Sequence, residues 1–118
     1  ELPIQLALTY PERIRANVQP LDLVKTGALH FSAPDPVRYP CFSLALRCAQ
    51  AGGDLPCVLN AAGEIAVCAF LGGQIKYTQI AEIIERTLEK FTPRKAESYA
   101  LLEDTDAAAR RAARGFLN

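Results

Sequence analysis

Asn60 and Glu64 are the residues of this sequence whose types and spacing could do chemistry. They lie four positions apart within VLNAAGEIAVCAF, residues 58–70, a stretch that is otherwise almost entirely apolar. A carboxylate and a carboxamide on one face of a helix could bind a divalent metal ion or transfer a proton. A single carboxylate without a second acidic residue at a suitable spacing is a weak metal site, however. We therefore expect no catalytic, cofactor-binding or metal-binding residue in this chain.

A structural role explains the same pair better. Steps of 100° per residue place Asn60, Gly63 and Glu64 on one narrow stripe of a helix. A glycine inside a helix costs roughly 1 kcal/mol relative to alanine, so we expect another backbone to approach across Gly63 and to be bonded by the two polar side chains. A buried Glu64 would need a cation, which Arg38 or Arg47 in the preceding helix could supply. The pair is interpreted as an internal strut.

The other groups of chemical interest have simple explanations. His30 has no Cys or Ser arranged beside it as a nucleophile, so we expect it to be solvated or packed within its own segment. The cysteines lie 7, 9 and 11 positions apart, lack the Cys-x-x-Cys pair of zinc sites and have apolar neighbours, which favours buried free thiols: Cys41, Cys48, Cys57 and Cys68. A metal–thiolate protein is the alternative, which metal analysis would test. The Gly-Gly pairs at 52–53 and 72–73 follow predicted helices, so neither is a phosphate-binding loop.

Four helices are predicted to position these groups. A proline marks the start and a Gly-Gly pair the end of each of the first two helices. Asp54 is the expected N-cap of the second helix, and Thr78 is the expected N-cap of the third. The third carries an apolar stripe at helical spacing, and the fourth starts near Ser98 with a potential break at 104–106. Their expected ranges are residues 40–51, 54–71, 78–91 and 98–117. Short connections reverse sequential neighbours, which predicts a mainly α fold, an antiparallel four-helix bundle with the second helix at its centre.

Residues 1–35 are rich in proline and predict an extended arm that precedes a bundle domain spanning residues 36–118. Within the arm, PIQLALTY at 3–10 predicts a short helix that begins at Pro3. ALHFSA at 28–33 alternates apolar and polar residues like a lone β-strand. Since an unpaired strand leaves its backbone groups without partners, we expect another part of the chain to supply them.

Composition excludes several classes of function. Thirteen basic and thirteen acidic side chains cancel, which argues against nucleic acid and against a charged membrane surface as partners. No apolar run reaches the roughly 18 residues that span a bilayer, and ELPIQLALTY lacks the features of a signal peptide. The sequence has no methionine, even at position 1. We expect a piece of a longer cytoplasmic protein.

Five separated blocks, taken in order, resemble the C-terminal portion of the 1-deoxy-D-xylulose 5-phosphate reductoisomerase family. The resemblance covers nearly all 118 residues, and the family's LNAANE pattern occurs here with Gly63 where Asn is usual. The blocks are LPIQLALTYPER, LDLVKTGALHFSAPDPVRYPC, LNAAGEIAVCAFL, IKYTQIAEIIERTLE and DAAARRAA.

The resemblance implies a parent enzyme that uses NADPH and Mg²⁺ or Mn²⁺ to convert 1-deoxy-D-xylulose 5-phosphate to 2-C-methyl-D-erythritol 4-phosphate in the non-mevalonate route to isoprenoids. It implies that residues 1–35 link a catalytic domain to a helical domain at 36–118. The nucleotide, metal and phosphate sites would lie upstream of Glu1, so the fragment itself would hold no cofactor and act as scaffold. Its partners would be the upstream domains of the same chain, in a homodimer of the bacterial cytoplasm rather than of a plastid.

A protein of another class fits the same residues. A free-standing helical interaction module could use the exposed arm to capture a strand of a partner protein. The sequence encoded upstream of Glu1 distinguishes the two interpretations, because only the reductoisomerase requires a nucleotide-binding fingerprint and an acidic metal motif there.

Overall fold

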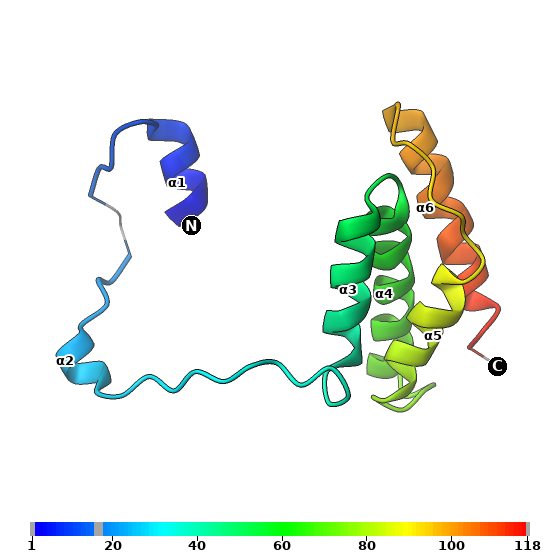
Figure 1. Cartoon of the computed structure of the whole chain (residues 1–118), viewed down its shortest axis with the longest axis horizontal. Helices are drawn as coiled ribbons and strands as arrows, with labels where there is room; N and C mark the ends of the chain where they lie inside the picture. The colour runs from blue at the N-terminus through cyan, green and yellow to red at the C-terminus, as the bar shows by residue number, and fades with distance from the viewer. Residues whose placement is uncertain (1, 16–17, 118) are drawn as a thin grey trace. The chain divides into compact units, whose positions relative to one another are not determined.

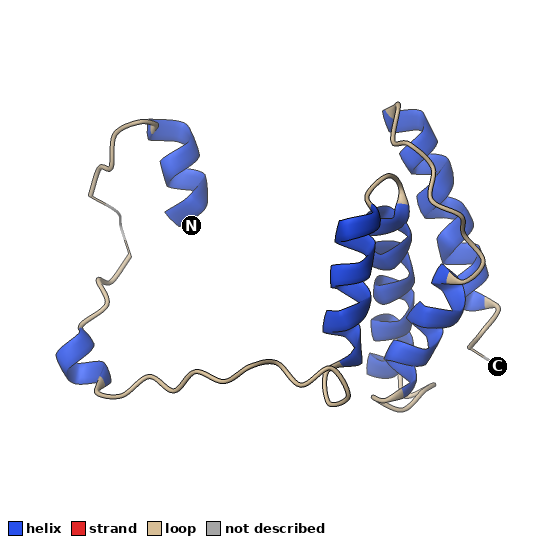
Figure 2. Cartoon of the chain, viewed as in Figure 1, coloured by secondary structure: helices blue, strands red, loops and turns tan. Residues whose placement is uncertain are grey.

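The computed structural model describes residues 2–15 and 18–117, and these contain six α-helices and no β-strand (Figures 1 and 2). The predicted mainly α fold is therefore confirmed. The chain divides into two compact units, residues 1–33 and residues 34–118. The predictions that fall on residues 1, 16, 17 and 118 lie outside the described part.

The first unit contains two short helices, α1 (Leu2–Thr9) and α2 (Leu23–Thr26). Helix α1 is the helix predicted to begin at Pro3, and neither helix has a buried residue. Helix α2 was not predicted, although the sequence carries its two end signals. The Asp22 carboxylate accepts hydrogen bonds from the backbone N–H groups of Val24 and Lys25, each at 3.1 Å, and Gly27 ends the helix with φ of +73°.

The predicted β-strand at 28–33 is wrong in this structure, where these residues have irregular backbone (Figure 2). Leu29 and Phe31 do alternate with His30 and Ser32, but both apolar side chains are largely exposed. A strand exists only by pairing, and residues 2–15 and 18–117 include no second strand to pair with it. The alternating pattern alone could not show this.

The second unit contains α3 (Pro40–Ala51), α4 (Leu55–Leu71), α5 (Gln79–Leu88) and α6 (Tyr99–Arg114). All four lie where the sequence predicted helices, with two differences at the boundaries. Helix α5 ends at Leu88 instead of near residue 91. Helix α6 follows its N-cap, Ser98, and continues through residues 104–106 without the potential break.

Helix α4 is central in this unit and packs against α3, α5 and α6 (Figure 1). Sequential helices reverse direction, so α4 and α6 run the same way. Small side chains line the contact between these two helices, including Ala61 and Ala109, and allow the two backbones to approach closely. The rest of the apolar core joins Leu44 of α3 and Ile83 and Ile84 of α5 to the alanines of α4.

Candidate functional site

A chain of polar side chains joins α4 to α6 and includes both residues of the candidate pair. The Arg110 Nη2 donates to Glu64 Oε2 at 2.6 Å, while Arg110 Nε donates to Asp106 Oδ2 at 2.6 Å. The Asn60 amide donates to the other oxygen of Glu64 at 3.2 Å. The hydrogen bond from Arg110, as the largest cause, and that from Asn60 lower the pKa of Glu64, so the carboxylate is a poor proton acceptor.

The expectation of a buried Glu64 paired with Arg38 or Arg47 is wrong. The Glu64 side chain is half exposed, and its cation comes from α6. Arg38 lies over the ring of Tyr39 at 5.7 Å, and Arg47 pairs with Glu85 at 3.4 Å. The stripe containing Asn60 and Glu64 faces outward because the buried side of α4 is the side that carries its alanines.

Close approach of a backbone across Gly63 is also not observed. A Cβ built at Gly63 would lie 3.8 Å from the Cδ1 of Ile84, which is ordinary van der Waals contact with a side chain. Instead, Gly63 lies in an open surface hollow of about 570 Å³ that is also lined by Asn60, Glu64 and Val67. The polar pair therefore lies at the surface of α4, where Glu64 alone contacts another helix through Arg110, and is not an internal strut.

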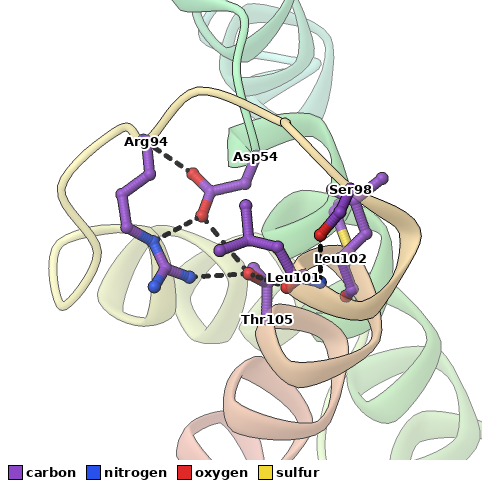
Figure 3. Close-up of polar contacts among 7 residues, drawn as sticks. Asp54, Arg94, Ser98, Leu101, Leu102 and Thr105 are labelled. Atoms are coloured by element: carbon purple, nitrogen blue, oxygen red, sulfur yellow. Dashed lines mark hydrogen bonds and ion pairs between the residues drawn. The ribbon is translucent and has the colours of Figure 1, made fainter.

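A second polar cluster, which the sequence did not predict, lies between α4, α6 and the loop that connects α5 to α6, with Asp54 and Thr105 buried and Arg94 partly exposed. The fully buried Asp54 carboxylate accepts hydrogen bonds from the backbone N–H of Arg94 and from its Nε, both at 2.9 Å (Figure 3). Thr105 Oγ1 donates to Asp54 Oδ2 at 3.3 Å and accepts from Arg94 Nη2 at 2.7 Å. We call Asp54, Arg94 and Thr105 the buried triad.

The backbone beside Asp54 reinforces the same contact. The Asp54 N–H donates to the carbonyl oxygen of Arg94 at 2.9 Å, so the two residues are joined by main chain and by side chain. A Cβ built at Gly53 would lie 2.3 Å from that carbonyl oxygen, and Gly53 has φ of +59°. Only glycine fits there, because any side chain would strain the turn and displace the loop.

Two opposing effects set the pKa of Asp54. Removal from water raises the pKa, whereas the hydrogen bonds and positive charge of Arg94 and the bond from Thr105 lower it, and the net shift is downward. The carboxylate is therefore ionised and satisfied by protein donors. Since it is also inaccessible to solvent, its geometry supports a structural role between the loop and two helices rather than one in chemistry.

The sequence did point to Asp54, but as the N-cap of α4. Asp54 occupies that position, yet its side chain caps no backbone group of the helix. An N-cap side chain bonds the second or third N–H of the helix, and the second residue here is Pro56, which has none. The Cys57 N–H donates instead to the Asp54 carbonyl, at 3.1 Å. The carboxylate is thus free to face Arg94, 40 positions away in sequence.

The other candidate groups are not brought together. His30 is exposed in the first unit, within the irregular segment. All four cysteines are free, but only Cys48 is buried and Cys41 and Cys68 are exposed, which corrects the prediction of buried thiols throughout. Removal from water, which is only partial for Cys41, raises the pKa of the Cys41, Cys48 and Cys57 thiols. Within residues 2–15 and 18–117, no three His, Cys, Asp or Glu residues are grouped so that they could hold a metal ion.

Comparison with known proteins relates this chain to a family. The family model described as the DXP reductoisomerase C-terminal domain matches residues 1–112. The 1-deoxy-D-xylulose 5-phosphate reductoisomerase of Cupriavidus necator is 50% identical over 112 residues, which are 95% of this chain and 28% of that protein. The enzyme of the same name from Moorella thermoacetica is 47% identical over 112 residues, again 95% of this chain, and 29% of that protein.

Solved structures of such enzymes share the fold. The Zymomonas mobilis reductoisomerase in complex with NADPH matches with a TM-score of 0.88 and 38% identity, over 99% of this chain and 31% of that chain. A DOX-P reductoisomerase in complex with NADPH, fosmidomycin and magnesium matches with a TM-score of 0.82 and 35% identity, over 98% of this chain and 31% of that chain. The chain thus spans less than a third of the length of these relatives.

Proposed function

The chain belongs to the DXP reductoisomerase C-terminal domain family, and on this premise we propose that it is the C-terminal scaffold of a longer reductoisomerase. The proposed parent enzyme converts 1-deoxy-D-xylulose 5-phosphate to 2-C-methyl-D-erythritol 4-phosphate with NADPH and a divalent cation. The observation that carries the proposal is 50% identity across 95% of this chain but only 28% of the relative that bears the activity in its name.

The described residues favour a scaffold over a catalytic role. Their one fully buried carboxylate, Asp54, is bonded to Arg94 and Thr105, and Glu64 is held by Arg110. The described residues do not provide a cluster that fits a metal ion. We propose that the groups that bind NADPH, magnesium and substrate belong to the upstream part of the polypeptide.

The proposed organisation has residues 1–35 as a linking arm and residues 36–118 as the helical domain, an antiparallel bundle of α3, α4, α5 and α6. Two observations support this organisation: the chain divides between residues 33 and 34, and α4 is central in the second unit. The proposed parent is a homodimer in the bacterial cytoplasm. Among the described residues, no helix is both long and apolar enough to cross a membrane.

The test is an assay of the full-length protein alongside two shortened forms. The full-length protein is expected to oxidise NADPH when 1-deoxy-D-xylulose 5-phosphate and Mg²⁺ are supplied, and residues 1–118 alone are expected not to. A full-length protein lacking residues 36–118 should have lower activity or a lower unfolding temperature. An inactive full-length protein, or activity of residues 1–118 by themselves, would refute the proposal.

A further inference from the structure

Exposed apolar side chains are concentrated at one place in the second unit. Among its described residues, nine large apolar side chains are exposed, and five of them line a single groove. A sixth, Phe70, packs edge to face against one of the five, Tyr77, with ring centroids 5.7 Å apart. Scattered exposed apolar residues are ordinary, but a contiguous group of this kind marks a contact surface.

We call this feature the apolar groove. It has a volume of about 630 Å³ and lies where the start of α3 meets the end of α4 and the start of α5. Of the lining residues the structure describes, Arg38 alone is charged, and its guanidinium lies over the Tyr39 ring. The exposed apolar residues of the groove are Val37, Tyr39, Phe42, Val67 and Tyr77.

We infer that the apolar groove is the surface on which the upstream part of the same polypeptide docks. This inference rests on the proposed function, because it requires the longer chain. The chain spans 27–31% of the length of its relatives, so more than two thirds of such a polypeptide lies outside the structure. Covering Tyr77 and Val37, which are 73% and 88% exposed, would remove apolar surface from water, and this burial favours docking.

Covalent connection favours this occupant over a separate molecule. Residues Pro34 and Val37 that line the groove directly follow the first unit in sequence, so a domain attached through that unit has a high effective concentration near them. The chemistry expected of the docking segment is apolar, with a carboxylate or a carbonyl group placed to accept from Arg38.

Photocrosslinking in the full-length enzyme tests the inference. Tyr77 is replaced by p-benzoylphenylalanine, and Tyr99 of α6 receives the same replacement as a matched control because it is similarly exposed, at 76%, but does not line the groove. Irradiation is expected to join position 77, in the turn that precedes α5, to a peptide upstream of Glu1 within one polypeptide. The same replacement at position 99 should give much less crosslinking to that peptide.

The outcomes separate the inference from the function on which it rests. A crosslink from position 77 to a second copy, detected as a species of doubled mass, or no crosslink in an active enzyme, would overturn the docking inference and leave the proposed function intact. If the Tyr77 variant does not accumulate, the half-exposed Tyr39 carries the probe with the same expected results. A wild-type protein without reductoisomerase activity would instead refute the proposed function.

Discussion

Two residues placed far apart in sequence, Asp54 and Arg94, form an ion pair whose carboxylate is buried. The two partners differ in environment, since the Asp54 side chain is 1% exposed and that of Arg94 is 53% exposed. The cost of breaking the contact therefore falls mainly on the carboxylate, which would be left buried without its cation. An exposed pair such as Arg47 and Glu85 has no such cost, because water replaces the lost partner.

Replacing Arg94 with Ala is expected to destabilise the 118-residue chain by about 3 kcal/mol, because the buried carboxylate loses its cation and the hydrogen bond from Arg94 Nε. Arg47→Ala is the matched control and should cost less than about 1 kcal/mol. Urea unfolding followed by circular dichroism measures both. Equal losses for the two variants would mean that the buried triad contributes no more than a surface ion pair.

Stability should also depend on pH through Asp54. Its pKa is lowered in the folded state, so its contribution is present above the unfolded pKa of about 3.9 and is lost as the pH falls through the lower folded value. Urea unfolding of wild type and Asp54→Asn between pH 7 and pH 3 is the measurement. Wild type should be the more stable protein at pH 7, with the difference shrinking toward pH 3. A difference that stays constant over this range would contradict the prediction.

At the scale of elements, the turn between α3 and α4 fixes where the α5–α6 connection lies. Gly53 has no room for a side chain, and the Arg94 carbonyl beside it receives the Asp54 N–H. The connection therefore passes beside the start of α4 (Figure 3). Helix α6 then runs in the same direction as α4 (Figure 1). By contrast, the mid-helix Gly63 has no comparable constraint.

The two glycines make a matched pair of substitutions. Gly53→Ala is expected to destabilise the chain by at least about 1 kcal/mol, because its φ is +59° and the added Cβ would clash with backbone. Gly63→Ala should be neutral or stabilising by up to roughly 1 kcal/mol, since the new methyl meets Ile84 at an ordinary distance and alanine favours a helix. Thermal unfolding of both variants measures the difference. A loss at position 63 as large as that at position 53 would contradict this reasoning.

At the scale of the whole molecule, the two units differ in how much of their surface is buried. The described part of the first unit has no buried residue, whereas the second has a core built around α4. An apolar core supplies most of the stability of a small helical unit, while segments without one open easily. We therefore expect the first unit to open more readily than the second in the isolated chain.

Hydrogen exchange of the 118-residue chain should show this difference directly. Amides in the interior of α4 are expected to exchange most slowly, and those of residues 18–33 to exchange at nearly the rate of an unfolded chain. In the full-length protein the amides of residues 18–33 should become protected. Strong protection of residues 18–33 in the isolated chain would contradict the prediction.

The sequence by itself determined the positions of α1, α3, α4, α5 and α6, because helix periodicity and end signals are local properties. It also determined that α4 is central, since nearly all of its faces are apolar or small. Together with the family resemblance, these features were enough to predict a helical C-terminal domain.

Tertiary structure decided which residues met across the helices. Arg110 instead of Arg38 or Arg47 pairs with Glu64, and Asp54 faces Arg94 instead of capping α4. It also decided that residues 28–33 form no strand, since no strand lies beside them in the described part of the chain. The physical reason is common to all three: each depends on a partner distant in sequence, and local preferences give a residue its range of conformations but not its neighbour in space.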